Sequence, residues 1–393
     1  MAVSFTVERG IPIQDANPSF CWFHPRAAAI PGAGERGGPR VVMTMNRHLD
    51  ADDHYSGLFY MYTDDFGGSW HGPFEPSALA WEVVSESLHA SVHDATPGWH
   101  AQTGRLLLIG GKTHYDPQGG HANDAPGRVR TSYAVYDAST DTWTKLRDLA
   151  YPDDPMFASA VSGSCQWLAG PDGAVLVPVY YAIPPGRRGR GYGVTVLRCR
   201  FDGETLSYVA HGPEIVHDTA KGFTEASLAA FRGVYYLTLR GEVDENGYVA
   251  TSSDGLHFSP PEPWRFDDGR ELGSVNTQQH WLAHSEGLFL CYTSRREHNA
   301  RIPRHRAPLY IAQVDPKRLR VIRETERALI PDRGLMLGNF GADAITSEQS
   351  WVTDAEFLWF SKGYRPTPEG GNDSVWVARV LWSAPNSLAP HSA

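Results

Sequence analysis

The sequence feature that most constrains the fold is the eight-residue stretch 63–70 (TDDFGGSW), which directly follows an apolar segment. Asp65 and Gly67 are typical of a tight turn between two strands, and Trp70 returns the chain to an apolar layer. Weaker versions of this stretch recur at 133–143 and 247–258. A turn that is repeated along one chain predicts an array of similar strand units in a single domain, although length alone suggests two or three domains.

Three landmarks of a four-stranded unit occur in order six times along the chain: an inner strand, a second apolar strand and an outer strand. The expected inner strands are 21–30, 92–101, 163–169, 224–231, 277–283 and 341–346. The expected second strands are 41–45, 105–109, 174–181, 234–240, 288–293 and 356–361. The expected outer strands are 58–62, 133–136, 194–201, 248–251, 309–314 and 374–382. The sequence therefore predicts an all-β fold, a six-bladed β-propeller with four antiparallel strands in each blade.

The two ends of the chain are expected to complete the ring of blades. The last outer strand lies near the C-terminus, and its pairing with the short segment 3–5 would cover an exposed sheet edge. We therefore expect one propeller domain over residues 1–386 and a loose C-terminal tail over residues 387–393. Signals for helices are almost absent.

Composition limits the class of partner and the compartment. The net charge of −10 argues against nucleic acid or an anionic membrane surface as a partner, and no apolar run reaches the length of about 20 residues that spans a bilayer. The start of the chain lacks the pattern of a secretory signal, and the four cysteines show no metal-type spacing. We expect a cytoplasmic monomer or small homo-oligomer with buried thiols, no cofactor and no metal.

Polar residues at the beginnings of the inner strands and the ends of the second strands should gather around one mouth of the central channel. The candidate catalytic residues are Glu225, His93, Asp94, His280, Tyr180 and His24. The candidate substrate-binding residues are Arg26, Arg47, His48, His100, His114, Arg240, Gln279, Arg295, Arg304, Arg306 and Asn339. Basic residues concentrated in an acidic chain favour a carboxylated ligand held by guanidinium groups. The alternative for each residue taken singly is a solvated rim position or a packing role.

The stretch 63–70 resembles the Asp-box, or BNR repeat, of the sialidase superfamily, and the resemblance extends over nearly the whole chain. It implies that the Asp-box is structural, on the outer rim, and that the site surrounds a carboxylated sugar. Glu225 and Arg240, 15 residues apart, match the family's Glu and second Arg. The family's first Arg, its Asp and its third Arg are matched by Arg26, by Asp50, Asp52 or Asp53, and by Arg304 or Arg306. The late Tyr nucleophile has no counterpart, because Phe340 of the segment 338–341 (GNFG) cannot attack a carbon.

A closer resemblance, over residues 21–382, is to uncharacterised bacterial sialidase-like proteins and to the rhamnosidase and rhamnose-glucuronate lyase families of similar fold. It rests on the motifs HPRA (24–27), WH (99–100), NTQQHW (276–281), RHRAPL (304–309) and LGNFG (337–341). It implies a site that uses His, with Arg and Tyr around an acidic sugar, in place of the sialidase pair of Tyr and Glu.

These observations lead to three hypotheses about function. The first is an exo-acting, sialidase-like glycoside hydrolase that cleaves a terminal bond in an acidic (uronate- or sialate-type) oligosaccharide, with Glu225 or Asp94 activating water. The second is a polysaccharide lyase that cleaves a rhamnose-glucuronate type linkage by β-elimination, with Arg240 on the carboxylate and a His or Tyr180 taking the proton. The third is a non-catalytic, sugar-binding propeller.

Overall fold

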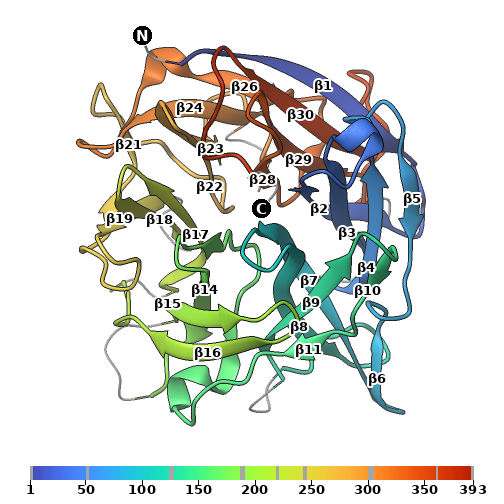
Figure 1. Cartoon of the computed structure of the whole chain (residues 1–393). Coiled ribbons are helices and arrows are strands. Elements are labelled where there is room, and N and C mark those ends of the chain that lie inside the picture. Colours follow the sequence, from blue (N-terminus) through green and yellow to red (C-terminus); the bar gives the residue numbers. More distant parts are fainter. Residues whose placement is uncertain are drawn as a thin grey trace.

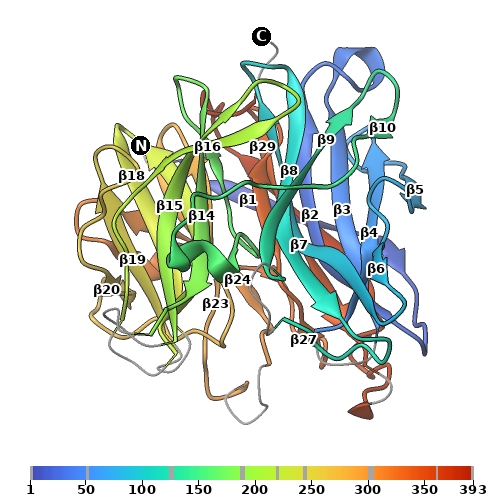
Figure 2. The ribbon, with the colours of Figure 1, turned by 90° about the horizontal axis from the view of Figure 1, so that it is seen from below.

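The computed structural model describes residues 3–49, 53–123, 128–185, 191–217, 221–241, 246–299, 305–359 and 362–390 of the chain. Six sheets, antiparallel apart from one short parallel pair in the fifth, surround a central axis, seen end-on in Figure 1 and from the side in Figure 2. Helical structure in the described residues is limited to three short 3-10 turns, η1 (Glu35–Gly37), η2 (Pro155–Ser159) and η3 (Arg323–Thr325). The prediction of an all-β, six-bladed propeller is confirmed.

Each of the first three blades has an inner strand on the axis and successive strands further out. Blade one consists of β2 (Cys21–Ile30), β3 (Arg40–His48), β4 (Tyr55–Thr63) and β5 (His71–Phe74). Blade two consists of β7 (Leu88–His100), β8 (Arg105–Tyr115), β9 (Arg130–Asp137) and β10 (Thr142–Trp143), with β6 (Glu82–Ser85) beside β7 and β11 (Arg147–Asp148) beside β9. Blade three consists of β12 (Ala160–Val161) and β13 (Leu168–Ala169), both on β14 (Ala174–Ala182), then β15 (Tyr192–Phe201) and β16 (Leu206–His211).

The remaining three blades follow the same order. Blade four consists of β17 (Phe223–Phe231), β18 (Val234–Gly241), β19 (Gly247–Ser252) and β20 (Glu262–Pro263). Blade five consists of β22 (His280–His284), β23 (Gly287–Thr293), β24 (Leu309–Asp315), β25 (Arg320–Val321), β26 (Arg327–Ile330) and β21 (Arg265–Phe266). Blade six consists of β27 (Met336–Leu337) and β28 (Gly341–Ala344), both on β29 (Gln349–Phe357), then β30 (Ser374–Trp382) and β1 (Phe5–Gln14).

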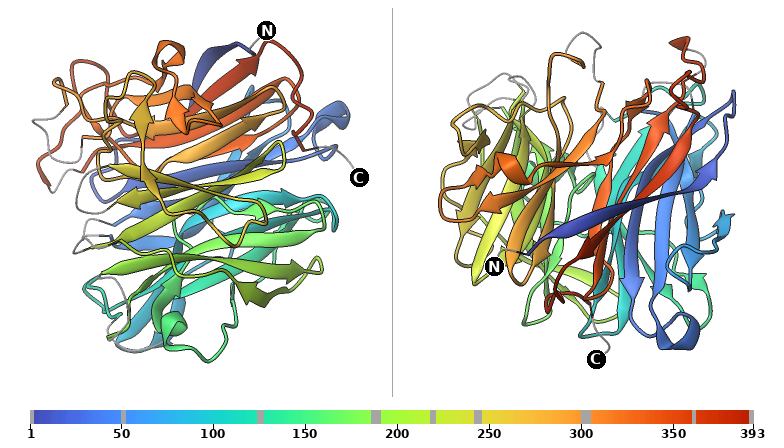
Figure 3. Two further views of the ribbon diagram at one scale, coloured as in Figure 1. Left: turned by 90° about the vertical axis from the view of Figure 1, so that its left-hand side faces the viewer. Right: turned by 90° about the horizontal axis from the view of Figure 1, so that it is seen from above.

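The ring is closed by pairing of the two ends of the chain, as expected. Strand β1 runs antiparallel to β30, from Phe5 opposite Trp382 to Gln14 opposite Ser374, and Figure 3 shows the blue N-terminal strand lying beside the red C-terminal one. The closing strand is longer than the expected segment 3–5. It supplies the outermost strand of blade six and so covers the sheet edge that β30 would otherwise expose.

Two expected strands are wrong in position. The second strand of blade six is β29, not 356–361, because β29 carries Thr353, Asp354 and Glu356 as buried polar residues and so lacks an apolar run. The inner strand of blade three is not continuous over 163–169, because only β12 and β13 pair with β14 on either side of Ser164. Both departures occur where polar side chains point toward the channel or a neighbouring blade.

Apolar side chains of adjacent blades pack face to face, and these layers fix the positions of the blades. Leu107 and Ile109 of β8 pack in one cluster with Val175 and Val177 of β14, and corresponding clusters join the other blades. The alternation of side chains along a strand gives each sheet two apolar faces, since both faces are covered by neighbours. The second strands are therefore almost uniformly buried.

The Asp-box forms the turn between β4 and β5. The hydroxyl of Thr63 donates to Asp65 Oδ1 (2.8 Å) and accepts from the backbone N–H of Gly67 (2.8 Å), while Asp65 accepts from the backbone N–H of Ser69 (2.9 Å). Trp70 packs on Trp351 of blade six at 6.0 Å between ring centres. Because β4 begins beside His48 and ends beside Val41, this turn lies at the end of the blade opposite the predicted mouth.

The last described residues pack across the far end of the central channel. The Asn386 side chain donates to the carbonyl of Ala283 (2.9 Å) and accepts from the backbone N–H of Ser285 (2.9 Å), and its backbone N–H donates to Ser347 (2.7 Å). Residues 387–390 help to line a cavity of about 790 Å³ there. Blade five and blade six are therefore joined by this segment, while residues 391–393 lie outside the described residues.

Asn386→Ala is expected to lower the free energy of unfolding by about 1–3 kcal/mol, because it leaves a partly buried carbonyl and a partly buried N–H without their Asn386 partners. Urea unfolding measures the change. Leu388→Ala, at an exposed position two residues away, is the matched control and should change stability little. Equal stability of the two variants would contradict a role for Asn386 in joining the blades.

Candidate functional site

In each of five blades, one residue in or next to the inner strand adopts a left-handed backbone at the same end of the channel. In β2, β7 and β17 the residue sits in a β-bulge, where the pairing register shifts. The five residues and their φ angles are His24 (54°), Asp94 (54°), Ser164 (52°), Glu225 (42°) and Asn276 (49°). A bulge turns a side chain out of the regular alternation. The left-handed backbone, in a bulge at three of these positions, turns five polar side chains toward one mouth, where Asn339 of blade six joins them.

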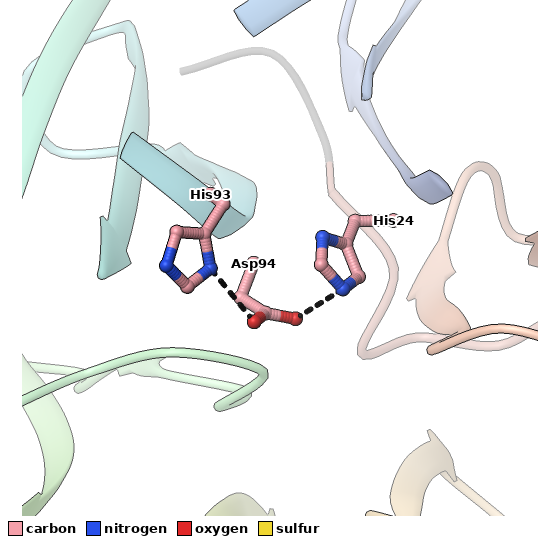
Figure 4. Close-up of side chains that lie close together, drawn as sticks. All are labelled: His24, His93 and Asp94. Carbon is pink, nitrogen blue, oxygen red and sulfur yellow. Dashed lines mark hydrogen bonds and ion pairs between the residues drawn. The ribbon is translucent and has the colours of Figure 1, made fainter. Parts of the chain in front are cut away.

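Asp94 is the centre of the hydrogen bonds at this mouth. His24 Nε2 lies 2.9 Å from its Oδ1 and His93 Nδ1 lies 3.0 Å from its Oδ2, as Figure 4 shows. The hydroxyl of Ser164 donates to the same Oδ1, and Asn339 Nδ2 is 3.3 Å away. Burial by itself raises the pKa of Asp94, but the charge and hydrogen bonds of the two histidines outweigh it and hold that pKa well below the usual range. Asp94 is therefore a fixed anion.

The two histidines beside Asp94 differ in environment. Burial lowers the pKa of His24 to about 4, although Asp94 opposes the shift, so His24 is neutral at pH 7 and donates through Nε2. His93 is more exposed, with 13% of its side chain accessible, and its Nε2 lies 3.0 Å from Thr113 Oγ1. A carboxylate on Nδ1 fixes the proton there and leaves Nε2 as the nitrogen that exchanges a proton with a ligand. The catalytic role of His93 stays a prediction, and its partial exposure is compatible with proton exchange.

Two guanidinium groups meet at Asn276 on the other side of the mouth. Arg240 Nη1 lies 2.5 Å from Glu225 Oε1, and its Nη2 lies 2.9 Å from Asn276 Oδ1. Arg306 Nη2 donates to the Asn276 carbonyl at 2.7 Å, and its Nη1 donates to Asn339 Oδ1 at 2.5 Å. The predicted Glu225–Arg240 pair is present, and Arg306 lies next to it. Two cations held rigidly side by side suit a carboxylate.

Tyr180 lies within reach of the charges of both acidic groups of the site. Its hydroxyl oxygen is 3.2 Å from the point that a Cβ atom on Gly163 would occupy, and Asp94 Cβ is 3.5 Å from that point. Burial, followed by the charges of Glu225 and Asp94, raises the pKa of Tyr180 well above its usual value. Tyr180 is therefore a protonated phenol at neutral pH and a potential proton donor.

The structure does not bring all predicted site residues to the mouth. His100 ends β7 at the opposite end of the channel, where it contacts Thr103 and the Gly173 carbonyl. The prediction for His100 is wrong because β7 is 13 residues long, about 40 Å at 3.3 Å per residue, so its two ends reach opposite faces. Arg47 is also misplaced. It alternates with Asn46 and His48, and its guanidinium lies over the rings of Phe20, Trp22 and Phe59.

Three further candidates are buried next to the mouth and bond to other protein groups. His280 is buried, with Nδ1 bonded to the Ser227 hydroxyl (2.8 Å) and Nε2 to the Phe340 carbonyl (2.9 Å), so neither nitrogen faces a ligand. Gln279 bonds to Thr238 between blades four and five. Arg26 is 1% exposed and donates to Ser164 Oγ (2.9 Å) and the Phe340 carbonyl (3.3 Å). These side chains position the site instead of lining it.

The other candidates lie at the edges of the site. His48 is buried among aromatic rings behind His24, including those of Phe23 and Trp359. His114 Nδ1 bonds to the carbonyl of Arg128 at 2.5 Å. Arg295 is exposed, and Arg304 lies outside the described residues. Their roles in substrate binding stay predictions.

Sequence reasoning missed Asn276 as the residue that joins Arg240 to Arg306, and Tyr55, whose ring lies 4.8 Å from both His24 and His93. Asparagine is enriched in left-handed backbone, so Asn276 at an inner-strand start was a usable signal. No sequence signal pointed to Tyr55, because its position depends on the register between β3 and β4.

A metal ion is one chemical alternative for the Asp94 cluster. The donor atoms of His24, His93 and Asp94 all lie within 4.8 Å of one another. However, Arg26 Nη2 is 3.5 Å from Asp94 Oδ1, and Ser164 and Asn339 donate to that same oxygen. The carboxylate charge is thus already balanced, and the cluster fits an anion that orients two imidazoles better than it fits a cation site.

No helix of the described residues is long and apolar enough to cross a membrane. No protein-family model and no curated protein matches the chain. Solved structures do match. A protein of unknown function from Dyadobacter fermentans DSM 18053 is 14% identical with a TM-score of 0.63, and the match covers 97% of this chain and 99% of that one.

Two sialidases are similar in structure. Trypanosoma rangeli sialidase is 14% identical with a TM-score of 0.61, over 95% of this chain and 59% of that one. The Hadza microbial sialidase Hz136 is 13% identical with a TM-score of 0.63, and the match covers 94% of this chain and 67% of that one. This chain thus spans about three fifths of the length of the trypanosomal enzyme. At such identities the likeness shows the fold alone, and the chain has a sialidase-like, six-bladed propeller fold.

Proposed function

We propose that this protein is an exo-acting enzyme that cleaves a terminal glycosidic bond in an acidic oligosaccharide. The observation that carries the proposal is the meeting of Arg240 and Arg306 at Asn276, opposite the His93–Asp94 pair. One side of the mouth suits the carboxylate of a uronate or sialate residue, and the other side suits proton transfer. A sugar carboxylate bound by the two guanidinium groups would be oriented toward His93.

In the hydrolytic reaction, the protonated His93 donates its Nε2 proton to the leaving oxygen while Glu225 accepts a proton from the attacking water. Asp94, an anion bonded to Nδ1, holds the ring in a fixed orientation. Arg240 holds Glu225 at 2.5 Å and fixes its orientation. The products are two sugars, each with a new hydroxyl group.

Elimination is a second candidate, and the position of Tyr180 favours it. The hydroxyl of Tyr180 is protonated and lies, like Asp94, beside Gly163, so it can give its proton to a departing glycosidic oxygen. His93 would remove the proton next to the substrate carboxylate, whose negative charge Arg240 and Arg306 neutralise. Neither Asp94 nor Glu225 would then act directly, which agrees with their other bonds at the mouth.

The test uses rhamnosyl-glucuronate and sialyl oligosaccharides with the purified protein. Elimination creates a conjugated double bond that absorbs in the near ultraviolet, whereas hydrolysis releases the terminal sugar without that absorbance. Either product supports the proposal and selects the reaction. Saturable binding of these sugars without any product would instead indicate a sugar-binding propeller. The absence of both binding and product would refute the anionic-sugar site.

Arg240→Lys is expected to retain the fold and to weaken binding or turnover by about 2–3 kcal/mol, roughly 30- to 150-fold. Lysine keeps the charge but loses the planar fork that reaches Glu225 and Asn276 together. Kinetics or calorimetry with glucuronate measures the loss, with the exposed Arg318→Lys as control. A large drop in melting temperature with unchanged affinity would mean that Arg240 only stabilises blade four.

A further inference from the structure

A second cluster of histidines lies between blades one and two, outside the candidate site. His54 immediately precedes β4, His89 lies at the start of β7, and His121 follows β8. Trp81 and Tyr115 pack among them. None of the proposed chemistry uses these side chains.

The rings of His54 and His89 face each other through their Nε2 atoms, which are 3.5 Å apart. Trp81 stacks on both rings, at 4.4 Å from His89 and 5.5 Å from His54, with interplanar angles of 28° and 22°. The Trp81 indole is held in turn, because its Nε1 donates to the Tyr55 carbonyl at 2.8 Å. The two imidazoles are thus oriented by packing, with one ring nitrogen of each aimed at a common point.

This spacing is that of two ligands of one metal ion. A tetrahedral ion bound to imidazole nitrogens at about 2.0–2.1 Å places those nitrogens about 3.4 Å apart. Burial is the main cause that lowers the pKa values of both His54 and His89, and the charges of His89 and His121 lower that of His54 further. Both rings are therefore neutral at pH 7, so each can present a lone pair.

Asp116 and His121 lie near this pair, but no third His, Cys, Asp or Glu donor of the described residues lies within 4.8 Å of both Nε2 atoms. Asp116 acts on both histidines as the opposing charge, and its Oδ1 is fixed by the backbone N–H groups of Gln118 and Gly120. His121 is exposed, and its Nε2 is 3.4 Å from the Asp53 carbonyl. Water can complete the coordination of a borderline divalent cation, and the nearby Asp116 carboxylate offsets part of its charge.

We propose that His54 and His89 are the two protein ligands of a divalent transition-metal site of the zinc, nickel or copper class, with water molecules as the remaining ligands. The ion joins the start of β4 in blade one to the start of β7 in blade two. It lies one residue from Tyr55, whose ring contacts His24 and His93. The site is independent of the proposed sugar chemistry, because no ligand belongs to the candidate site.

The test is a titration of the metal-free full chain with Zn²⁺, followed by Co²⁺ to detect the visible absorbance of tetrahedral coordination. The expected results are saturable binding of one ion, a higher melting temperature, and weaker binding as the pH falls below about 6 and protons compete for the imidazoles. His54→Gln and His89→Gln should each weaken binding at least about 10-fold. His71→Gln, at an exposed position on β5, is the matched control.

Three outcomes would overturn the proposal. The first is the absence of saturable binding by the wild-type chain. The second is equal affinity in the wild type and in a folded His54→Gln variant, with folding checked by circular dichroism. The third is loss of the ion in His93→Gln together with its retention in His54→Gln and His89→Gln, which would assign the metal to the Asp94 cluster instead.

Discussion

Asp94→Ala is expected to lower kcat/KM by roughly 10²–10⁴-fold on any acidic oligosaccharide that the wild-type protein cleaves. The substitution removes the anion that fixes the His93 proton on Nδ1, so the imidazole can adopt the wrong tautomer and loses its stabilising charge. It also leaves the donors of His24 and Ser164 without their shared acceptor in a buried place. A decrease in melting temperature should therefore accompany the loss of activity.

Asp94→Asn separates the two effects. The amide preserves volume and part of the hydrogen bonding, so its melting temperature should exceed that of Asp94→Ala, while the activity loss should be of similar size. Asp202→Ala, in an exposed turn, is the matched control and should behave like the wild type. Wild-type kcat/KM in folded Asp94→Asn would remove Asp94 from the mechanism.

The second large effect concerns stability against pH. Asp354 in β29 is fully buried, and no hydrogen-bond partner for its Oδ2 is found among the described residues. Burial raises its pKa to about 7, in spite of the opposing charges of Arg306 and Arg26. Between the unfolded pKa near 4 and this folded value, the native state holds a proton that the unfolded state has lost. Stability therefore falls as pH rises from about 4 to 7, by roughly 4 kcal/mol for this one group.

Asp354→Asn should remove that share of the pH dependence. Urea unfolding of the wild type and the variant at pH 5, 6, 7 and 8 is expected to show a difference in slope of about 1.4 kcal/mol per pH unit between pH 5 and 6.5. Asp343 and Asp373 of the same blade, with pKa values raised by burial to about 7 and about 8, keep part of the dependence in the variant. Parallel profiles of the two proteins would show that Asp354 is ionised in the native state.

Strand positions were easiest to predict from the sequence where burial alone determines the residue pattern. The second strands, such as β8, β18 and β23, were placed correctly because both of their faces are buried and the apolar run has to be continuous. Strand β29 was misplaced because its buried Asp354 and Glu356 break that run. Glu356 is bonded to Arg333, a residue 23 positions earlier that gives no local signal.

For the candidate site, the sequence predicted which residues surround the mouth better than it predicted which way they point. The separation of Glu225 and Arg240 corresponds to the length of two antiparallel strands joined by a turn. The register of β17 against β18 does place Arg240 opposite Thr224, next to Glu225. The roles of Arg26 and His280 depend on depth along the channel, which spacing does not determine. Arg47 failed for a related reason, since a single step along a strand reverses the direction of a side chain.

The left-handed residues at the mouth have a consequence for how this protein can change. A residue other than glycine in that backbone conformation costs on the order of 1–3 kcal/mol, so random drift under selection for stability alone would fill these positions with glycine or asparagine. Four of the five, His24, Asp94, Ser164 and Glu225, are neither. Because each belongs to a different blade and none is part of the apolar layers between blades, one substitution alters the chemistry of the mouth without changing those layers. New specificities are thus accessible one blade at a time.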